Sequence, residues 1–186
     1  MEIFSQFESL VIQTIQKSLG VETLYAEYAY VGLALLAILM IGWLANLLVK
    51  RFLLGVVRSI AKKTKTKLSE YLLEESFFLR LSHLAPAFVI GALSDLVFSS
   101  YPVVAGLIEV LINLYLVAIA LWVLDAIIDT FYMLYEESAF STKLPLKGIC
   151  QAIKIVVNVT GVIFILSILL DKSPLYLFSG LGALTA

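Results

Sequence analysis

Long uncharged stretches alternate with shorter charged segments along this chain. The longest, Tyr28–Val49, contains 22 residues and no charge. As a helix it would be about 33 Å long, enough to cross the roughly 30 Å of hydrocarbon in a bilayer. Helices of a soluble bundle would show an apolar stripe and a polar face instead. The pattern therefore predicts an all-α, polytopic membrane protein.

The same pattern predicts four complete transmembrane helices and the start of a fifth. The four complete spans are Tyr28–Val49, Leu81–Phe98, Val103–Leu124 and Gly148–Leu170. A further apolar segment begins at Ser173 and has 14 residues. It would form about 21 Å of helix, so we expect it to be cut inside a transmembrane helix. Serine and proline in the connections 99–102 and 171–174 predict tight turns, which would make the flanking helices antiparallel neighbours.

The first residues form a separate amphipathic element. On a helical wheel one sector is polar and apolar side chains cover the rest; the polar members are Ser5, Gln6, Ser9, Gln13, Gln16 and Lys17. This pattern predicts a helix over 2–19 that either lies in the outer membrane interface or packs against the first span. We divide the chain into an interfacial segment (1–27), transmembrane helices (28–170) and the start of a last helix (171–186).

Basic residues predict the orientation of the chain in the membrane. Eleven of the 13 lysines and arginines lie in the connections after the first and third spans or just inside the fourth, and only Lys17 and Lys172 lie on the opposite side. By the positive-inside rule those connections are cytoplasmic and the N-terminus is outside. Four lysines of the first connection could also contact anionic lipid headgroups, or serve only as this topology signal; they are Lys62, Lys63, Lys65 and Lys67.

Asp95 and Glu109 are acidic residues inside predicted spans. An acid near the centre of a span is costly and is therefore a candidate for moving protons or ions. Both residues lie only six to eight positions from the turn around Ser100 and Tyr101, so water could reach them. The alternative is that they form polar helix ends or hydrogen bonds within the hairpin.

Other polar side chains give weaker signals. Asp125 and Asp129 share a helix face, as two metal-binding carboxylates would, but no further acidic or histidine ligands converge on them. His83 begins a predicted helix for which Ser82 is a plausible N-cap, and Pro86 is tolerated in its first turn. A single cysteine, Cys150, excludes an intrachain disulfide.

Sequence motifs of catalysis are absent. There is no glycine-rich phosphate loop, no set of nucleophile and base, and no nucleotide-binding motif. We therefore expect no enzymatic activity, no cofactor, no metal site, no nucleic-acid partner and no small-molecule substrate. Composition agrees with a membrane protein, since 61% of residues are apolar and 15% are charged, against about 45–50% and 25% in soluble domains.

The last quarter of the chain resembles a known family. Its features, in order, are Leu144-Pro145-Leu146-Lys147-Gly148, then Gln151, Ile153 and Lys154, a long apolar helix, Ser173-Pro174, and Ser179-Gly180-Leu181-Gly182-Ala183. In this order and spacing they resemble the mechanosensitive channels of the MscS superfamily, in particular the five-helix, miniconductance-type branch of Gram-negative bacteria. The similarity covers about 43 of the 186 residues. The first 140 residues agree with the family only in span count and topology.

The resemblance implies a homoheptamer in the bacterial inner membrane. The helix after Ser173 would line the pore, and its small residues would pack closely against neighbouring subunits; they are Gly180, Gly182, Ala183 and Ala186. The earlier spans would form a lipid-facing paddle that senses membrane tension. Tension would open a weakly selective pore that releases solutes on hypo-osmotic shock.

Two other functions remain open at this point. A secondary transporter could use Asp95 and Glu109 to couple ions, although no internal repeat of the kind common in transporters is visible. A membrane scaffold without transport activity is the other alternative. In the family, the lower pore helix and the cytoplasmic domain would follow Ala186.

Overall fold

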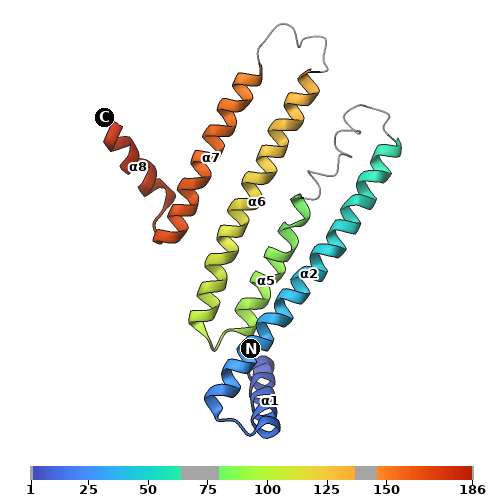
Figure 1. Cartoon of the computed structure of the whole chain (residues 1–186), viewed down its shortest axis with the longest axis vertical. Coiled ribbons are helices and arrows are strands. Elements are labelled where there is room, and N and C mark those ends of the chain that lie inside the picture. The colour runs from blue at the N-terminus through green and yellow to red at the C-terminus, as the bar shows by residue number, and fades with distance from the viewer. Residues whose placement is uncertain (1, 64–79, 137–145, 186) are drawn as a thin grey trace.

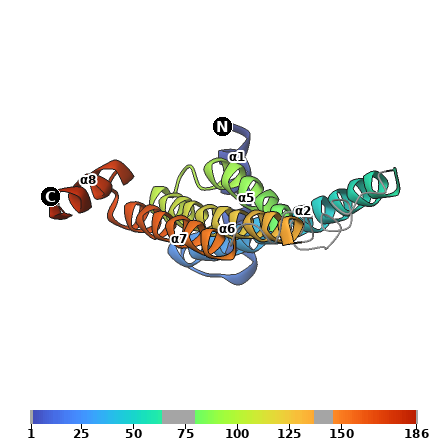
Figure 2. The same ribbon diagram turned by 90° about the horizontal axis from the view of Figure 1, so that it is seen from above.

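The computed structural model of the chain describes residues 2–63, 80–136 and 146–185, and these contain helices and no strand. The helices are α1 (Glu2–Leu19), α2 (Thr23–Lys63), α5 (Leu84–Val97), α6 (Pro102–Glu136), α7 (Leu146–Leu170) and α8 (Pro174–Thr185). In Figure 1, α2, α5, α6 and α7 run alternately up and down, and α5 lies between α2 and α6. Helix α8 projects away from the others in both Figure 1 and Figure 2.

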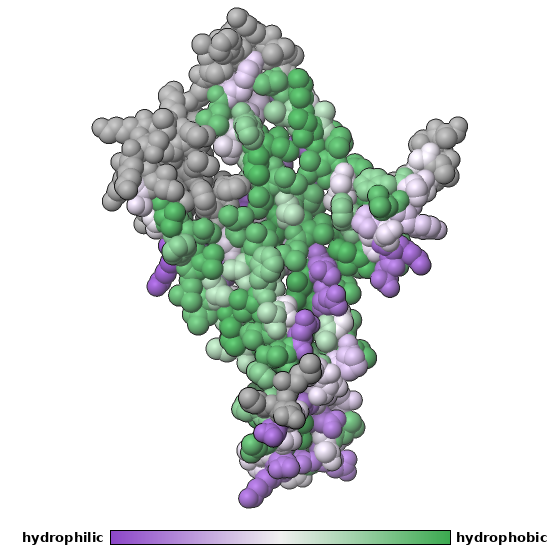
Figure 3. All heavy atoms as spheres, turned by 180° about the vertical axis from the view of Figure 1, so that it is seen from behind, coloured by the Kyte–Doolittle hydropathy of each residue, from purple (hydrophilic) through white to green (hydrophobic). Residues whose placement is uncertain are grey.

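The outward faces of these helices are apolar. Figure 3 shows a hydrophobic surface over the middle of the molecule, with hydrophilic residues gathered at the end where α1 lies. In the most apolar stretches of α2 and α6 only 11% of residues are buried. Water would make so much exposed apolar surface unfavourable, whereas lipid is as apolar as the side chains. The prediction of an all-α membrane protein is therefore confirmed.

The number of long spans differs from the prediction. Among the described residues, three helices are long and apolar enough to cross a membrane: Thr23–Val56 within α2, Pro102–Glu136 and Leu146–Leu170. The expected second span is represented by α5, which has 14 residues, and the expected fifth by α8, which has 12. The expectation of four complete spans plus a fifth is thus corrected to three helices of spanning length within residues 2–63, 80–136 and 146–185.

Pro86 explains why α5 is short. Residues 80–82 are helical, but the chain turns at His83 before α5 begins at Leu84. A proline has no N–H to donate to the carbonyl of Ser82, and its ring would clash with that carbonyl in a continuous helix. His83 is consequently the N-cap and makes no capping hydrogen bond through its side chain. The expected cap at Ser82 is wrong by one residue.

A cluster of buried apolar residues lies where α2, α5 and α6 meet, at the end where the turn connects α5 to α6. It consists of Ile38, Phe98 and Ile108, with partly buried apolar residues of the same three helices around them. Phe98 is fully buried at the turn between α5 and α6, and its backbone N–H bonds Ser94 O at 2.9 Å. The predicted tight turn at 99–102 is present, and it makes α5 and α6 antiparallel neighbours.

The predicted amphipathic helix over 2–19 is present as α1. It ends where Gly20 adopts a positive φ of 63°, and the Gly20 N–H bonds Gln16 O at 2.9 Å, a glycine C-cap. The helix packs against α2. Phe7, which lines a groove shared with α2 and α5, is still 60% exposed. Packing against α2 is therefore established, and apolar surface remains on the outer side of α1.

Candidate functional site

The connection from α7 to α8 is a tight turn fixed by local hydrogen bonds. Asp171 adopts a positive φ of 49°. The Lys172 N–H bonds Ser167 O at 3.0 Å, and the Ser167 hydroxyl donates to the Lys172 carbonyl. Ser173 precedes α8 as its N-cap, and its Oγ accepts from the Tyr176 N–H at 3.3 Å. Pro174 follows at the first helical position. The predicted turn at 171–174 is confirmed.

Helix α8 carries the small residues that the sequence singled out. A Cβ built at Gly180 or Gly182 would meet no atom within 4 Å. Leu175 and Tyr176, earlier on the helix, are 79% and 65% exposed. Ala183 lies in α8, but its side chain is outside the described part of the structure, as is the whole of Ala186. The described part of the chain thus leaves Leu175, Tyr176 and the position of Gly180 largely open on this helix.

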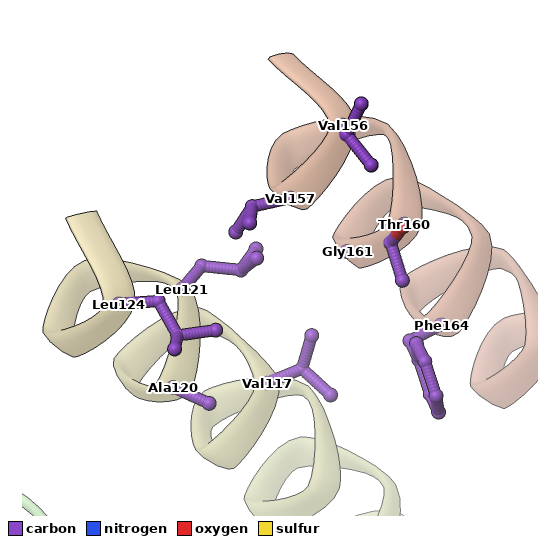
Figure 4. Close-up of a pocket in the computed structure, with 9 residues that line it drawn as sticks. All are labelled: Val117, Ala120, Leu121, Leu124, Val156, Val157, Thr160, Gly161 and Phe164. Carbon is purple, nitrogen blue, oxygen red and sulfur yellow. The ribbon is translucent and has the colours of Figure 1, made fainter. Parts of the chain in front are cut away.

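Glycines inside the helical layer have a different environment. A Cβ at Gly161 of α7 would lie 2.3 Å from Leu121 Cδ1 of α6, and a Cβ at Gly42 of α2 would lie 2.9 Å from Ile90 Cγ1 of α5. In Figure 4 the Leu121 side chain extends from α6 toward α7 beside Gly161. Neither glycine was singled out in the sequence. An apolar run interrupted by one glycine was the available signal, because small residues allow helices to approach closely in lipid.

The α6–α7 interface contains an open apolar groove of about 330 Å³. Val117, Leu121 and Leu124 line it from α6, and Gly161 and Phe164 line it from α7 (Figure 4). Thr160 supplies the one hydroxyl group among the residues drawn there. Such a lining suits hydrocarbon and offers nothing that could bind a charged substrate.

A three-residue ionic cluster joins α6 to α7 near one end of this groove. Lys154 Nζ lies 2.8 Å from Asp125 Oδ1 and 2.7 Å from Asp129 Oδ1. The two aspartates share a helix face, as predicted, and Lys154 Nζ lies between them. Within the described residues no group of three or more His, Cys, Asp or Glu could hold a metal ion. The spacing of the aspartates was visible in the sequence, but their partner 25 residues further on was not.

Asp95 and Glu109 are both exposed on the surfaces of α5 and α6. Neither lines the apolar grooves between α2, α5 and α6, between α1, α2 and α5, or between α6 and α7. The structure therefore does not bring them together in an internal site. The lysines predicted to contact headgroups cannot be placed in the same way. Lys62 and Lys63 end α2, but their side chains are not described, and Lys65 and Lys67 are outside the described residues.

The α5–α6 turn is tied to α1. Ser100 Oγ donates to Glu8 Oε2 at 2.9 Å, and the Tyr101 and Tyr30 rings are 6.1 Å apart. Burial, followed by the hydrogen bond to Glu8, raises the pKa of Tyr101 to about 12. The turn connecting two membrane helices is thereby linked to an amphipathic helix with exposed apolar side chains.

Arg80, His83, Tyr115 and Trp122 form a second polar cluster, between the beginning of α5 and the middle of α6. The Arg80 guanidinium lies 5.0 Å from the centre of the Trp122 ring, and His83 Nδ1 is 3.2 Å from Tyr115 Oη. The sequence offered only an isolated His83 at a helix start.

Protein-family models and solved structures were both compared with this chain, and neither comparison found a match. The structure itself defines the class of protein as an all-α membrane protein, with three helices of spanning length among the residues that it describes.

Proposed function

We propose that this chain is the sensor and upper-pore portion of a mechanosensitive ion channel. The observation that carries the proposal is the contrast between α8 and the preceding helices. Helix α8 leaves the layer after a tight turn and presents Gly180 to open space. An apolar helix that carries small residues, with Gly180 open to its surroundings, is suited to close packing against the same helix of other copies. The resemblance of residues 144–186 to the MscS superfamily points to a heptamer around a central pore.

The other helices suit a tension sensor. Helices α2, α5 and α6 form a thin apolar layer with a small buried core and lipid-facing surfaces on both sides. In this proposal α5 is a short membrane helix that returns the chain between α2 and α6. Membrane tension favours whichever conformation occupies the larger area in the membrane plane, so it acts as a ligand with different affinity for two states. The turn between α7 and α8 would transmit a movement of the layer to the pore.

The proposed location is the bacterial inner membrane, with the N-terminus in the periplasm. This orientation rests on the distribution of basic residues. With Cys150 replaced by serine, a cysteine at Ser100 should react with a membrane-impermeant reagent added to intact cells, whereas one at Ser59 should react only after lysis. Both positions are exposed in the structure. The opposite labelling pattern would reverse the proposed topology.

Electrophysiology tests the function itself. Patches containing the full gene product should show currents that open with suction, and the protein should improve survival of a channel-deficient bacterium after hypo-osmotic shock. Gly180→Leu should shift the tension threshold or abolish the current, because a leucine would hold packed helices apart. Gly106→Leu is the matched control, since a Cβ at Gly106 on α6 also meets nothing within 4 Å. Absence of tension-activated current from the wild-type protein would overturn the proposal.

A further inference from the structure

An apolar groove runs between α2, α5 and α6. Its volume is about 390 Å³. Residues lining it include Leu35, Leu39, Ala87, Ile90, Leu111 and Tyr115. Leu39 and Leu111 are 56% and 65% exposed, so the groove is open along its side. In Figure 1, α5 begins lower than the ends of α2 and α6.

A cluster of cationic and aromatic side chains continues from one end of this groove. Tyr115 lines the groove, and its hydroxyl is 3.2 Å from His83 Nδ1. The His83 ring lies 6.0 Å from the Trp122 ring, and the Arg80 guanidinium lies 5.0 Å from the same ring. Arg80 Nη1 also donates to Trp122 O at 2.6 Å. The groove therefore has an apolar body and an end with a permanent positive charge.

The position of Trp122 along α6 places this end at a membrane interface. Trp122 follows Pro102 by 20 residues, a rise of about 30 Å, which equals the thickness of the hydrocarbon core. If the polar turn at Ser99–Tyr101 lies at one surface, Trp122 lies at the other. Tryptophan and tyrosine concentrate at this level in membrane proteins, with arginine extending to the headgroups. The apolar part of the groove then lies at the depth of the acyl chains.

We propose that this groove binds an anionic phospholipid, with an acyl chain along Leu39, Ala87 and Leu111 and the phosphate at Arg80 and His83. A guanidinium has five N–H donors, and the bond to Trp122 O uses only one of its nitrogens. The remaining donors can bind a phosphate in the bidentate manner that arginine favours. Stacking on Trp122 holds the guanidinium in place. A free phosphate would leave the apolar groove unfilled, so the lipid is the ligand that matches both parts of the site.

Tryptophan fluorescence can report this lipid directly. The chain has two tryptophans, so Trp43→Phe leaves Trp122 as the only one. The full chain would be reconstituted into vesicles of unbrominated phosphatidylcholine. One series would contain added brominated phosphatidylglycerol and the other added brominated phosphatidylcholine, because brominated acyl chains quench nearby tryptophan. We expect brominated phosphatidylglycerol to quench Trp122 with about fivefold higher apparent affinity, the effect of roughly one basic residue near the surface.

Variants of the cationic end separate specific binding from general attraction. Arg80→Gln and His83→Gln should reduce the ratio of the apparent affinities for phosphatidylglycerol and phosphatidylcholine toward one. Arg80→Lys should keep part of the preference for phosphatidylglycerol. Arg51→Gln removes an exposed base from α2 outside the groove and should leave the preference unchanged. Equal quenching by the two lipids in the wild type would overturn the proposal. A preference that survives in both Arg80→Gln and His83→Gln would overturn it as well.

Variants of the apolar part test whether the acyl chain occupies the groove. Leu111→Phe should fill its open side and weaken quenching by phosphatidylglycerol. Leu107→Phe, one turn earlier on α6, is the matched control because Leu107 is similarly exposed and does not line the groove. Inorganic phosphate added to the vesicles should not compete. If phosphate competes and Leu111→Phe has no effect, the cationic cluster binds a phosphate group alone and the proposed lipid site is wrong.

Discussion

The α2–α5 and α6–α7 interfaces differ from helix α8 in how they use small residues. At Gly161 and Gly42 a single added carbon would collide with a side chain of the neighbouring helix, whereas at Gly180 it would meet nothing. The same residue type thus closes an interface in one region and remains uncovered in the other. Lipid provides no hydrophobic drive between helices, so close packing and polar contacts must hold them together. Gly161 and Gly42 are therefore enclosed by contacts within the chain, whereas Gly180 is available for the contacts with other copies that we propose for α8.

Polar contacts reinforce this difference. The α6–α7 interface combines Gly161 with the bridge from Lys154 to two aspartates. The α1–α2 pair is attached to the α5–α6 turn through Glu8 and Ser100. By contrast, the side-chain bonds of α8 that involve Ser173 and Ser179 stay within the turn or the helix itself. The following substitutions test whether the layer and α8 are as different as the geometry indicates.

Gly161→Leu should have the largest effect on the stability of the chain. The added side chain overlaps Leu121, whose Cγ would be 2.8 Å from the new Cβ, so α6 and α7 must separate. Overpacking of this kind costs about 1–3 kcal/mol. The free energy of unfolding, measured in mixed micelles with increasing denaturing detergent, should fall accordingly. Adding Leu121→Ala should restore part of it, and no recovery would argue against this contact as the cause.

Lys154→Met should have the next largest effect, because it leaves two aspartates without their cation. The side chains of Lys154 and Asp125 are 27% and 38% exposed, so screening reduces the expected loss to about 1 kcal/mol. The same unfolding measurement applies. Lys147→Met is the matched control, since Lys147 is exposed at the start of the same helix. Equal destabilisation by both substitutions would show that the cluster does not hold α6 and α7 together.

Gly180→Leu should change the stability of the single chain by less than about 0.5 kcal/mol, as is usual at an open surface position. Its effect should appear in association instead. In the full gene product, a cysteine placed at Ser179 should form strong crosslinks between copies when residue 180 is glycine. The same cysteine should form weak crosslinks in the Gly180→Leu variant. A loss of single-chain stability as large as that of Gly161→Leu would remove the proposed difference between the two regions.

Glu8→Gln should have the smallest effect, confined to the α1 contact with the turn. Because Tyr101 has a folded-state pKa of about 12, above the ordinary value near 10, its contribution to stability is present below pH 10 and is lost as the pH rises through 12. Glu8→Gln should lower the pKa of Tyr101 by the part that is due to Glu8, while the larger part that is due to burial remains. Tyrosinate absorbance during an alkaline titration would show the shift, and most of it should disappear in a Tyr101→Phe background.

Much of the fold could be predicted from local sequence patterns. The apolar runs specify helices, because in lipid every backbone group must be satisfied within its own segment. The amphipathic helix over 2–19 and the turns at 99–102 and 171–174 follow from polar periodicity, serine and proline. The length of α5 was missed because Pro86 and the turn at His83 shorten an otherwise continuous apolar run. That effect was present in the sequence, but apolar composition outweighed it in the prediction.

The sequence by itself determined the helices, their turns and the bias of basic residues toward one side. Only the tertiary structure decided which small residues are enclosed and which charges are paired. Lys154 meets Asp125 and Asp129 because α6 and α7 lie antiparallel at a particular rotation and height, and periodicity along one helix cannot fix either quantity. The same holds for Arg80 and Trp122, which are 42 residues apart. Contacts between helices depend on how two surfaces fit, whereas each helix depends mainly on its own residues.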